Sequence, residues 1–130
     1  MAAFAHRAHA DFYIVVQVNN PQPALTKEQA VDLYMGRVRA FANGDFALVL
    51  DLPRSSPKHA AFYWSLTGMT PAQVNSYWSR LMFSGQTLPP QPLPDEATMI
   101  DIVKHNSSAI GWLSREPADK QLRTLLVIKE

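Results

Sequence analysis

The chain lacks cysteine, long apolar runs and a strong net charge, and each absence excludes a class of protein. Without cysteine among its 130 residues, it forms no disulfide, no cysteine–zinc site and no thiolate nucleophile. No segment approaches the roughly 18 consecutive apolar residues expected of a membrane-spanning helix. The net charge of +1 provides no strongly basic surface, so we expect no nucleic-acid partner.

Signals for a cofactor, a metal or an enzyme are also missing. The five glycines are scattered and form neither a GxGxxG fingerprint nor a phosphate-binding P-loop. His59 and His105 are isolated and lack the spacing of metal ligands. Asp51, Ser55 and His59 are the residue types of a catalytic triad, but nothing in the sequence orients them. We therefore predict no cofactor, no metal and no enzymatic activity.

What is present is the composition of one globular domain, with 47% hydrophobic and 18% charged residues. Residues 1–10 are rich in alanine and end in Ala8-His9-Ala10, which resembles the small-residue cleavage site of an export signal without its apolar core. We interpret residues 1–10 as a tail or a signal-peptide remnant and residues 11–130 as the domain. An export signal would place the protein in the periplasm.

The pattern of apolar residues predicts strands that alternate with helices. β-Branched and apolar runs predict strands over 13–18, 46–52, 109–113 and 124–128, and helical patterns lie over 27–35, 57–66, 71–82 and 95–105. Residues 84–94 hold four of the ten prolines and are expected to form an extended connection without regular structure. The order β-α-β-α-α-α-β-β indicates an α/β fold with a mixed central sheet and helices on both faces.

Three helix starts carry specific signals. Thr26 with Gln29 and Thr70 with Gln73 form capping boxes, and Ser56 precedes Pro57 at the favoured first position of a helix. In the helix after Pro57, the successive aromatic residues 62–64 cannot all face the core, and Trp64 is the one to watch as an exposed side chain.

The loop between the strand over 46–52 and the helix at Pro57 is the best candidate site. A strand that leads through a short polar loop into a helix places unpaired N–H groups and the positive end of the helix dipole at one point. We predict an anion-binding site formed by five residues of this loop and the first helical turn: Arg54, Ser55, Ser56, Lys58 and His59. The alternative is that Ser56 only caps the helix.

Several short motifs, taken in order, resemble the substrate-binding proteins of phosphate ABC transporters. The motifs are Leu33-Tyr34-Met35-Gly36-Arg37, Asn43-Gly44, Arg54 with Phe62 eight residues later, the segment 77–85, Pro89-Pro90, and Ser108-Ala109-Ile110-Gly111-Trp112. The resemblance covers residues 13–128 and implies a single lobe of the periplasmic binding protein type, most similar to the second lobe of those proteins.

The resemblance also implies that the ligand is phosphate and that its affinity is limited. In that family an arginine is followed four residues later by Ser-Gly-Thr at a helix start, which cradles phosphate. Arg54 matches the arginine, whereas Lys58, His59 and Ala60 occupy the three cradle positions. Two hydroxyls and a glycine that admits close backbone approach are replaced. We therefore expect weak or absent phosphate binding by the monomer, unless two chains form a cleft together.

Two functions follow from these observations. The first is a periplasmic solute-binding-like protein that binds phosphate or a similar oxyanion and works with a membrane transporter. The second is a protein-interaction or sensory module that retains the lobe fold without its ligand and serves beside a transporter, a sensor kinase or an outer-membrane receptor. Outward-facing aromatic residues and the proline-rich segment 84–94 would then form its contact surface.

Overall fold

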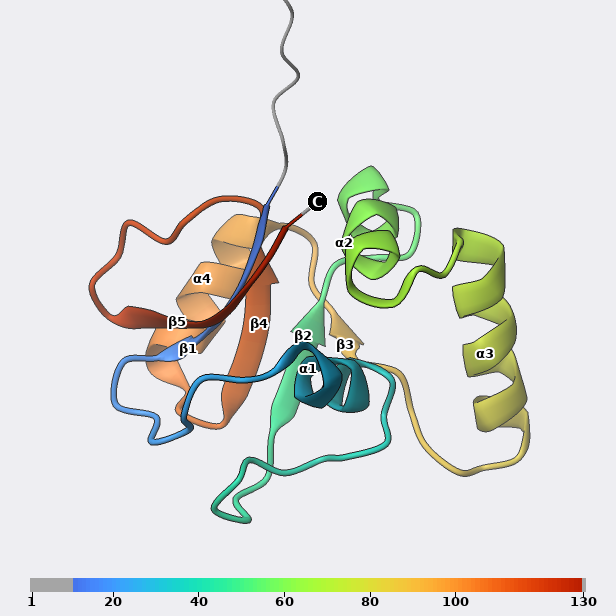
Figure 1. Cartoon of the computed structure of the whole chain (residues 1–130), viewed down its shortest axis with the longest axis horizontal. Coiled ribbons are helices and arrows are strands. Elements are labelled where there is room, and N and C mark those ends of the chain that lie inside the picture. Colours follow the sequence, from blue (N-terminus) through green and yellow to red (C-terminus); the bar gives the residue numbers. More distant parts are fainter. Residues whose placement is uncertain (1–10, 130) are drawn as a thin grey trace, which may run out of the picture.

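A mixed five-stranded sheet lies at the centre of the computed structural model, which describes residues 11–129 (Figure 1). Its strands are β1 (Phe12–Gln17), β2 (Leu48–Asp51), β3 (Gln91–Pro92), β4 (Ala109–Leu113) and β5 (Leu122–Ile128). They are ordered β3-β2-β4-β1-β5. β1 runs antiparallel to its neighbours β4 and β5, whereas β2 runs parallel to β3 and β4. The predicted mixed α/β sheet is confirmed.

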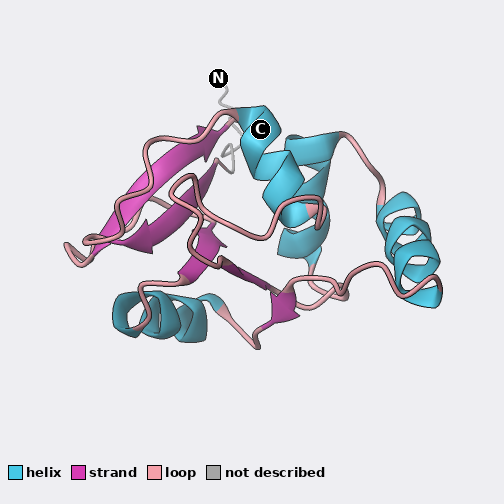
Figure 2. Cartoon of the chain, turned by 90° about the horizontal axis from the view of Figure 1, so that it is seen from below, coloured by secondary structure: helices cyan, strands magenta, loops and turns pink. Residues whose placement is uncertain are grey.

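Helices cover both faces of this sheet. They are α1 (Lys27–Tyr34), α2 (Pro57–Thr67), α3 (Pro71–Phe83) and α4 (Glu96–His105). In β4, a Cβ atom on Gly111 would lie 2.5 Å from the Met99 sulfur of α4, whereas the next residue, Trp112, stacks on Phe62 of α2. Because successive strand residues point to opposite faces, α4 and α2 lie on opposite faces. Figure 2 shows α4 across the strands from the other helices.

A cluster of aromatic rings joins α1 and α2 to the sheet. The Phe62 and Trp112 rings are parallel with centroids 4.3 Å apart, and Phe12 and Tyr34 meet Phe62 edge-on. All four side chains are almost fully buried, so each contributes on the order of 1.5–3 kcal/mol through removal of apolar surface from water. Trp64 is 58% exposed, as expected for the third of three successive aromatic residues.

Several strand predictions need correction. Segment 84–94 is not wholly irregular, because Gln91 and Pro92 form β3 beside Leu50 and Asp51, which changes the element order to β-α-β-α-α-β-α-β-β. The strand expected over 46–52 is shorter and begins at Leu48, because Phe46 turns outward with 60% exposure and forms an isolated bridge with Ala40. The last strand begins at Leu122, two residues earlier than expected.

Helix α3 lies at one end of the molecule, outside the sheet, in both views (Figures 1 and 2). Only Val74 and Trp78 of this helix are buried, and Met82 and Phe83 are exposed. The helix predicted over 71–82 therefore covers less core than its length suggests, because α3 packs beside α2 rather than on the strands.

Residues 1–10, interpreted above as a tail or signal-peptide remnant, fall outside the described part of the chain. Among the described residues, no helix combines the length and apolar character needed to cross a bilayer.

Candidate functional site

The predicted site residues lie at the edge of the sheet where the parallel strands end. β2 ends at Asp51 and β4 at Leu113, and helices α2 and α4 both begin near this edge (Figure 1). In open α/β sheets, ligands bind beyond the carboxyl ends of the strands. We call this region the carboxyl edge, and it has two sides, one toward β4 and one toward β3.

The turn that joins β2 to α2 positions Arg54, Ser55 and Ser56. It is closed by a hydrogen bond of 2.9 Å from the Ser56 amide to the Pro53 carbonyl. The Ser56 hydroxyl accepts a hydrogen bond from the Lys58 amide at 3.2 Å and caps α2. Helix capping is the alternative role predicted for Ser56 from the sequence. Ser55 is exposed in the turn. Arg54 is also exposed, and its Nη1 donates to Asn75 Oδ1 of α3 at 3.2 Å.

On the side toward β4, the ammonium group of Lys58 contacts a carboxylate. Its Nζ lies 2.9 Å from Glu96 Oε2 at the start of α4. The Glu96 carboxylate also accepts from the Ser114 amide at 3.0 Å and from the Ser114 hydroxyl at 2.6 Å. We call Lys58, Glu96 and Ser114 the Glu96 cluster.

Burial by itself would raise the pKa of the Glu96 carboxyl, but the hydrogen bonds from Ser114 and the charge of Lys58 outweigh it and lower the pKa. The Glu96 carboxylate is therefore an anion that three donors of the chain already hold.

His59 lies inward of this edge and pairs with Asp51. Both residues are buried, and His59 Nε2 is 3.4 Å from Asp51 Oδ2. The Asp51 carboxylate accepts three hydrogen bonds, from the Tyr63 hydroxyl at 2.7 Å, the Leu52 amide at 2.8 Å and the Trp112 indole at 3.0 Å. A buried carboxylate needs such a set of donors to remain in a dry interior.

This network also affects the tyrosine beside it. Burial first, and then the Asp51 carboxylate, raise the pKa of the Tyr63 hydroxyl well above its ordinary value. Tyr63 is therefore fixed as a hydrogen-bond donor to Asp51, and its ring stacks on the His59 imidazole with centroids 4.4 Å apart.

On the side toward β3, a cavity of about 210 Å³ opens beside Arg54 and His59. Its polar lining consists of Asp51, Arg54 and His59. Its apolar lining is formed by Leu52, Pro53, Trp78, Pro89, Pro90 and Pro92. We call it the proline cavity, because its apolar wall is mostly proline.

The five predicted site residues thus lie near one another, but their side chains have different contacts and roles. Arg54 and His59 line the proline cavity, Lys58 joins the Glu96 cluster, and Ser56 is used as a helix cap. Sequence reasoning did not find Glu96 or Ser114, because they are 38 and 56 positions from Lys58 and no local motif links them. Asp51 carried a signal, since it is a charged residue at the end of an apolar run.

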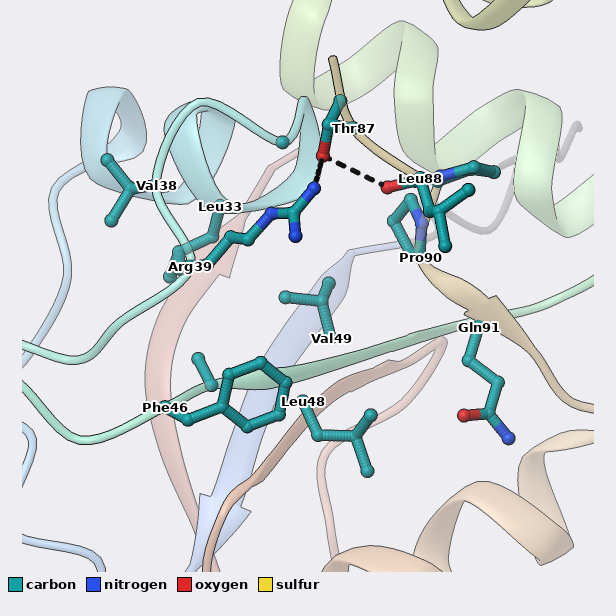
Figure 3. Close-up of a pocket in the computed structure, with 13 residues that line it drawn as sticks. Leu33, Val38, Arg39, Phe46, Leu48, Val49, Thr87, Leu88, Pro90 and Gln91 are labelled. Atoms are coloured by element: carbon teal, nitrogen blue, oxygen red, sulfur yellow. Dashed lines mark hydrogen bonds between the residues drawn. The ribbon is translucent and has the colours of Figure 1, made fainter. Parts of the chain in front are cut away.

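A larger cavity of about 280 Å³ lies on the other side of Pro89 and Pro90, between α1 and β2 (Figure 3). Its lining is largely apolar and includes Leu33, Phe46 and Leu88. The Arg39 guanidinium crosses it and hydrogen bonds to the Thr87 hydroxyl. None of the five predicted site residues lines it.

Comparison with known proteins identifies relatives by structure only. No protein-family model matches the chain, and no curated protein sequence does at a significant level. The fold matches an ABC-type phosphate transport receptor from Vibrio cholerae, with a TM-score of 0.70 and 21% identity over 91% of this chain and 46% of the receptor. It also matches a protein from Clostridium perfringens assigned as a phosphate ABC transporter substrate-binding protein and solved with bound phosphate. That match has a TM-score of 0.71 and 20% identity over 91% of this chain and 45% of the other.

At this level of identity the likeness establishes the fold and not the ligand. The chain spans slightly less than half the length of either protein, as expected if it corresponds to one of two lobes. The chain therefore has the fold of a single lobe of the phosphate ABC transporter substrate-binding proteins, which confirms the resemblance drawn from its sequence motifs.

Proposed function

We propose that this chain is a solute-binding-like lobe that holds a small oxyanion at Arg54. The observation that carries the proposal is the position of the Arg54 guanidinium, at the carboxyl edge and on the lining of a cavity. A guanidinium offers five N–H donors in a planar fork that matches an oxyanion. Asn75 accepts from Nη1, which keeps the fork close to α3 and the cavity.

The affinity of this site for inorganic phosphate is expected to be weak. The charge of Lys58 is balanced by Glu96, so Arg54 supplies most of the attraction. Arg54 is exposed, and an exposed ion pair contributes only about 0–1 kcal/mol. The Ser55 hydroxyl adds a hydrogen-bond donor. Tight capture would need a second wall that excludes water from the anion.

We further propose that the lobe acts outside the cytoplasm, beside a membrane transporter or a sensor protein. The support is the fold shared with an ABC-type phosphate transport receptor and the Ala-rich residues 1–10. A catalytic role has little support, because the Asp51 carboxylate and the His59 imidazole are buried together and Ser55 lies in the exposed turn.

The test is a thermal shift on phosphate-stripped protein, with phosphate, sulfate and chloride compared at matched ionic strength. A ligand that binds only the folded state stabilises it by about 2.7 kcal/mol at a hundredfold excess over Kd. We expect phosphate to raise Tm more than chloride does, and Arg54→Ala to remove most of that rise.

The matched control is Arg37→Ala, which removes the same charge at an exposed residue paired with Asp32, away from the cavity. Equal responses of the two variants would show that any phosphate effect is a general charge effect. In that case Arg54 would not form the site.

A second candidate function is contact with another protein. It is favoured by a group of exposed apolar side chains at the end of α3 and just after it, where Met82 is 47%, Phe83 96% and Leu88 74% exposed. Large apolar side chains gathered on one part of a surface often mark an interaction site. We propose a second copy of this chain as the occupant of this surface.

A further inference from the structure

We propose that the proline cavity selects the ligand, and that its ligand is an organic oxyanion with a compact apolar substituent, such as a phosphonate. The substituent enters the cavity and the charged group stays at Arg54. This inference rests on the oxyanion function proposed above and narrows it to a class of ligand.

The wall of the cavity is poor in hydrogen-bond donors. Four of its residues, Pro53, Pro89, Pro90 and Pro92, are prolines and have no backbone N–H. The Leu52 side chain and the carbon atoms of the Trp78 indole add apolar surface, and the Leu52 amide already donates to Asp51. A phosphate ion carries hydrogen-bond acceptors on every side, so it would lose its water inside this cavity without replacement. An apolar group loses nothing there and gains contact area.

The charged residues of the cavity lining would also orient a bound anion. The Asp51 carboxylate forms part of the lining and is already the acceptor of hydrogen bonds from Tyr63 and Trp112. A negative group repels an anion that approaches it in a poorly solvated space. Arg54 is the exposed positive group of the lining, and Asp51 is buried. The anionic part of a ligand is therefore drawn to Arg54 and kept away from the interior.

The volume fits this class of ligand. A dry apolar cavity of about 150 Å³ in a protein is large enough to bind benzene. The proline cavity, at about 210 Å³, has room for a phenyl ring, and it is smaller than the roughly 300 Å³ at which pockets for drug-sized molecules begin. Compact organic anions are thus the size class that can fill it.

The proposal is tested by titration calorimetry on the full, phosphate-stripped chain with inorganic phosphate, methylphosphonate, phenylphosphonate and phenol. We expect phenylphosphonate to bind at least about tenfold more tightly than inorganic phosphate, with methylphosphonate between them. Arg54→Ala should weaken both phosphonates. Phenol should bind less tightly than phenylphosphonate, because it lacks the charged group.

A cavity-filling variant separates the cavity from the anion site. Pro92→Trp places a large ring on the cavity lining, whereas Pro94→Trp, at an exposed residue outside it, is the matched control. We expect Pro92→Trp to bring phenylphosphonate down to the affinity of inorganic phosphate and Pro94→Trp to leave it unchanged. If Pro92→Trp fails to fold, the ligand series on the native chain still decides the question.

The failures of the two proposals can be told apart. If phosphate binds in a way that depends on Arg54 but phenylphosphonate binds no more tightly, the cavity proposal is wrong and the oxyanion function stands. If phenylphosphonate binds as phenol does and ignores Arg54→Ala, the cavity is merely apolar and the proposal is overturned. If none of the anions binds, both proposals fail.

Discussion

At the carboxyl edge of the sheet, the Glu96 carboxylate accepts hydrogen bonds from the Ser114 amide, the Ser114 hydroxyl and Lys58. These are the kinds of donor that would otherwise hold a bound oxyanion, so the residue limits the positive charge available to a ligand. The energetic role of Glu96 is therefore structural in the isolated chain. It ties the first turns of α2 and α4 to the residue that follows β4.

The lowered pKa of the Glu96 carboxyl predicts a pH-dependent contribution to stability. A carboxyl whose pKa is lower in the folded than in the unfolded chain stabilises the fold at pH values above its pKa in the unfolded chain, which is near 4.5. That contribution is lost as the pH falls through the folded-state pKa. We expect Glu96→Gln to reduce the free energy of unfolding by about 1–2 kcal/mol at neutral pH, with a difference that shrinks in acid.

The measurement is urea denaturation of both proteins from neutral pH to below pH 4.5, with Glu116→Gln, at an exposed residue, as the control. A difference that stays constant over this range would mean that the charge of Glu96 contributes nothing and that only the shape of the side chain matters.

At the scale of elements, the contact between α4 and the sheet depends on the absence of a side chain at Gly111. A Cβ atom there would lie 2.5 Å from the Met99 sulfur and 3.0 Å from its Cγ. Met99 is fully buried, so it has little space into which to move. The glycine of the motif 108–112 is therefore required by packing rather than by backbone conformation, and it sets the distance between α4 and β4.

Gly111→Ala is expected to destabilise the fold by about 1–3 kcal/mol, the usual cost of overpacking a core. The effect should appear as a lower denaturation midpoint with an unchanged slope. The double variant Gly111→Ala/Met99→Val should be more stable than the sum of the two single changes predicts, because the smaller side chain makes room for the new methyl group. Independent, additive effects would refute the close contact.

At the scale of the whole molecule, the exposed apolar group of Met82, Phe83 and Leu88 predicts association of the chain with itself. Phe83 is 96% exposed, and in water such a ring gains free energy from any surface that covers it. We expect the apparent mass in light scattering to rise with protein concentration, and Phe83→Ser/Leu88→Ser to remain monomeric with an unchanged Tm. Val18→Ser, at a 44% exposed residue of another region, serves as the control. A wild-type chain that stays monomeric at all concentrations would exclude a second copy as the occupant.

Local chemistry by itself determined the helices of this protein. The hydroxyls of Thr26, Ser56 and Thr70 each accept from a backbone amide at a helix start, because capping involves residues two or three positions apart. The motifs at 33–37, 54–62 and 108–112 likewise indicated the lobe fold that the structural matches confirm. The exposure of Trp64 also follows from the local sequence, because three consecutive helical residues cannot share one face.

Only the tertiary structure decided β3 and the partners of the site residues. β3 has two residues, one of them a proline, and it exists because the edge of β2 lies beside it; no periodicity can be read from so short a segment. Lys58 meets Glu96 across 38 positions, and Trp112 donates to Asp51 across 61. Such pairings depend on which strand ends the fold brings together, and hydrogen bonds and charges act over a few ångströms of space, however far apart the residues are in the sequence.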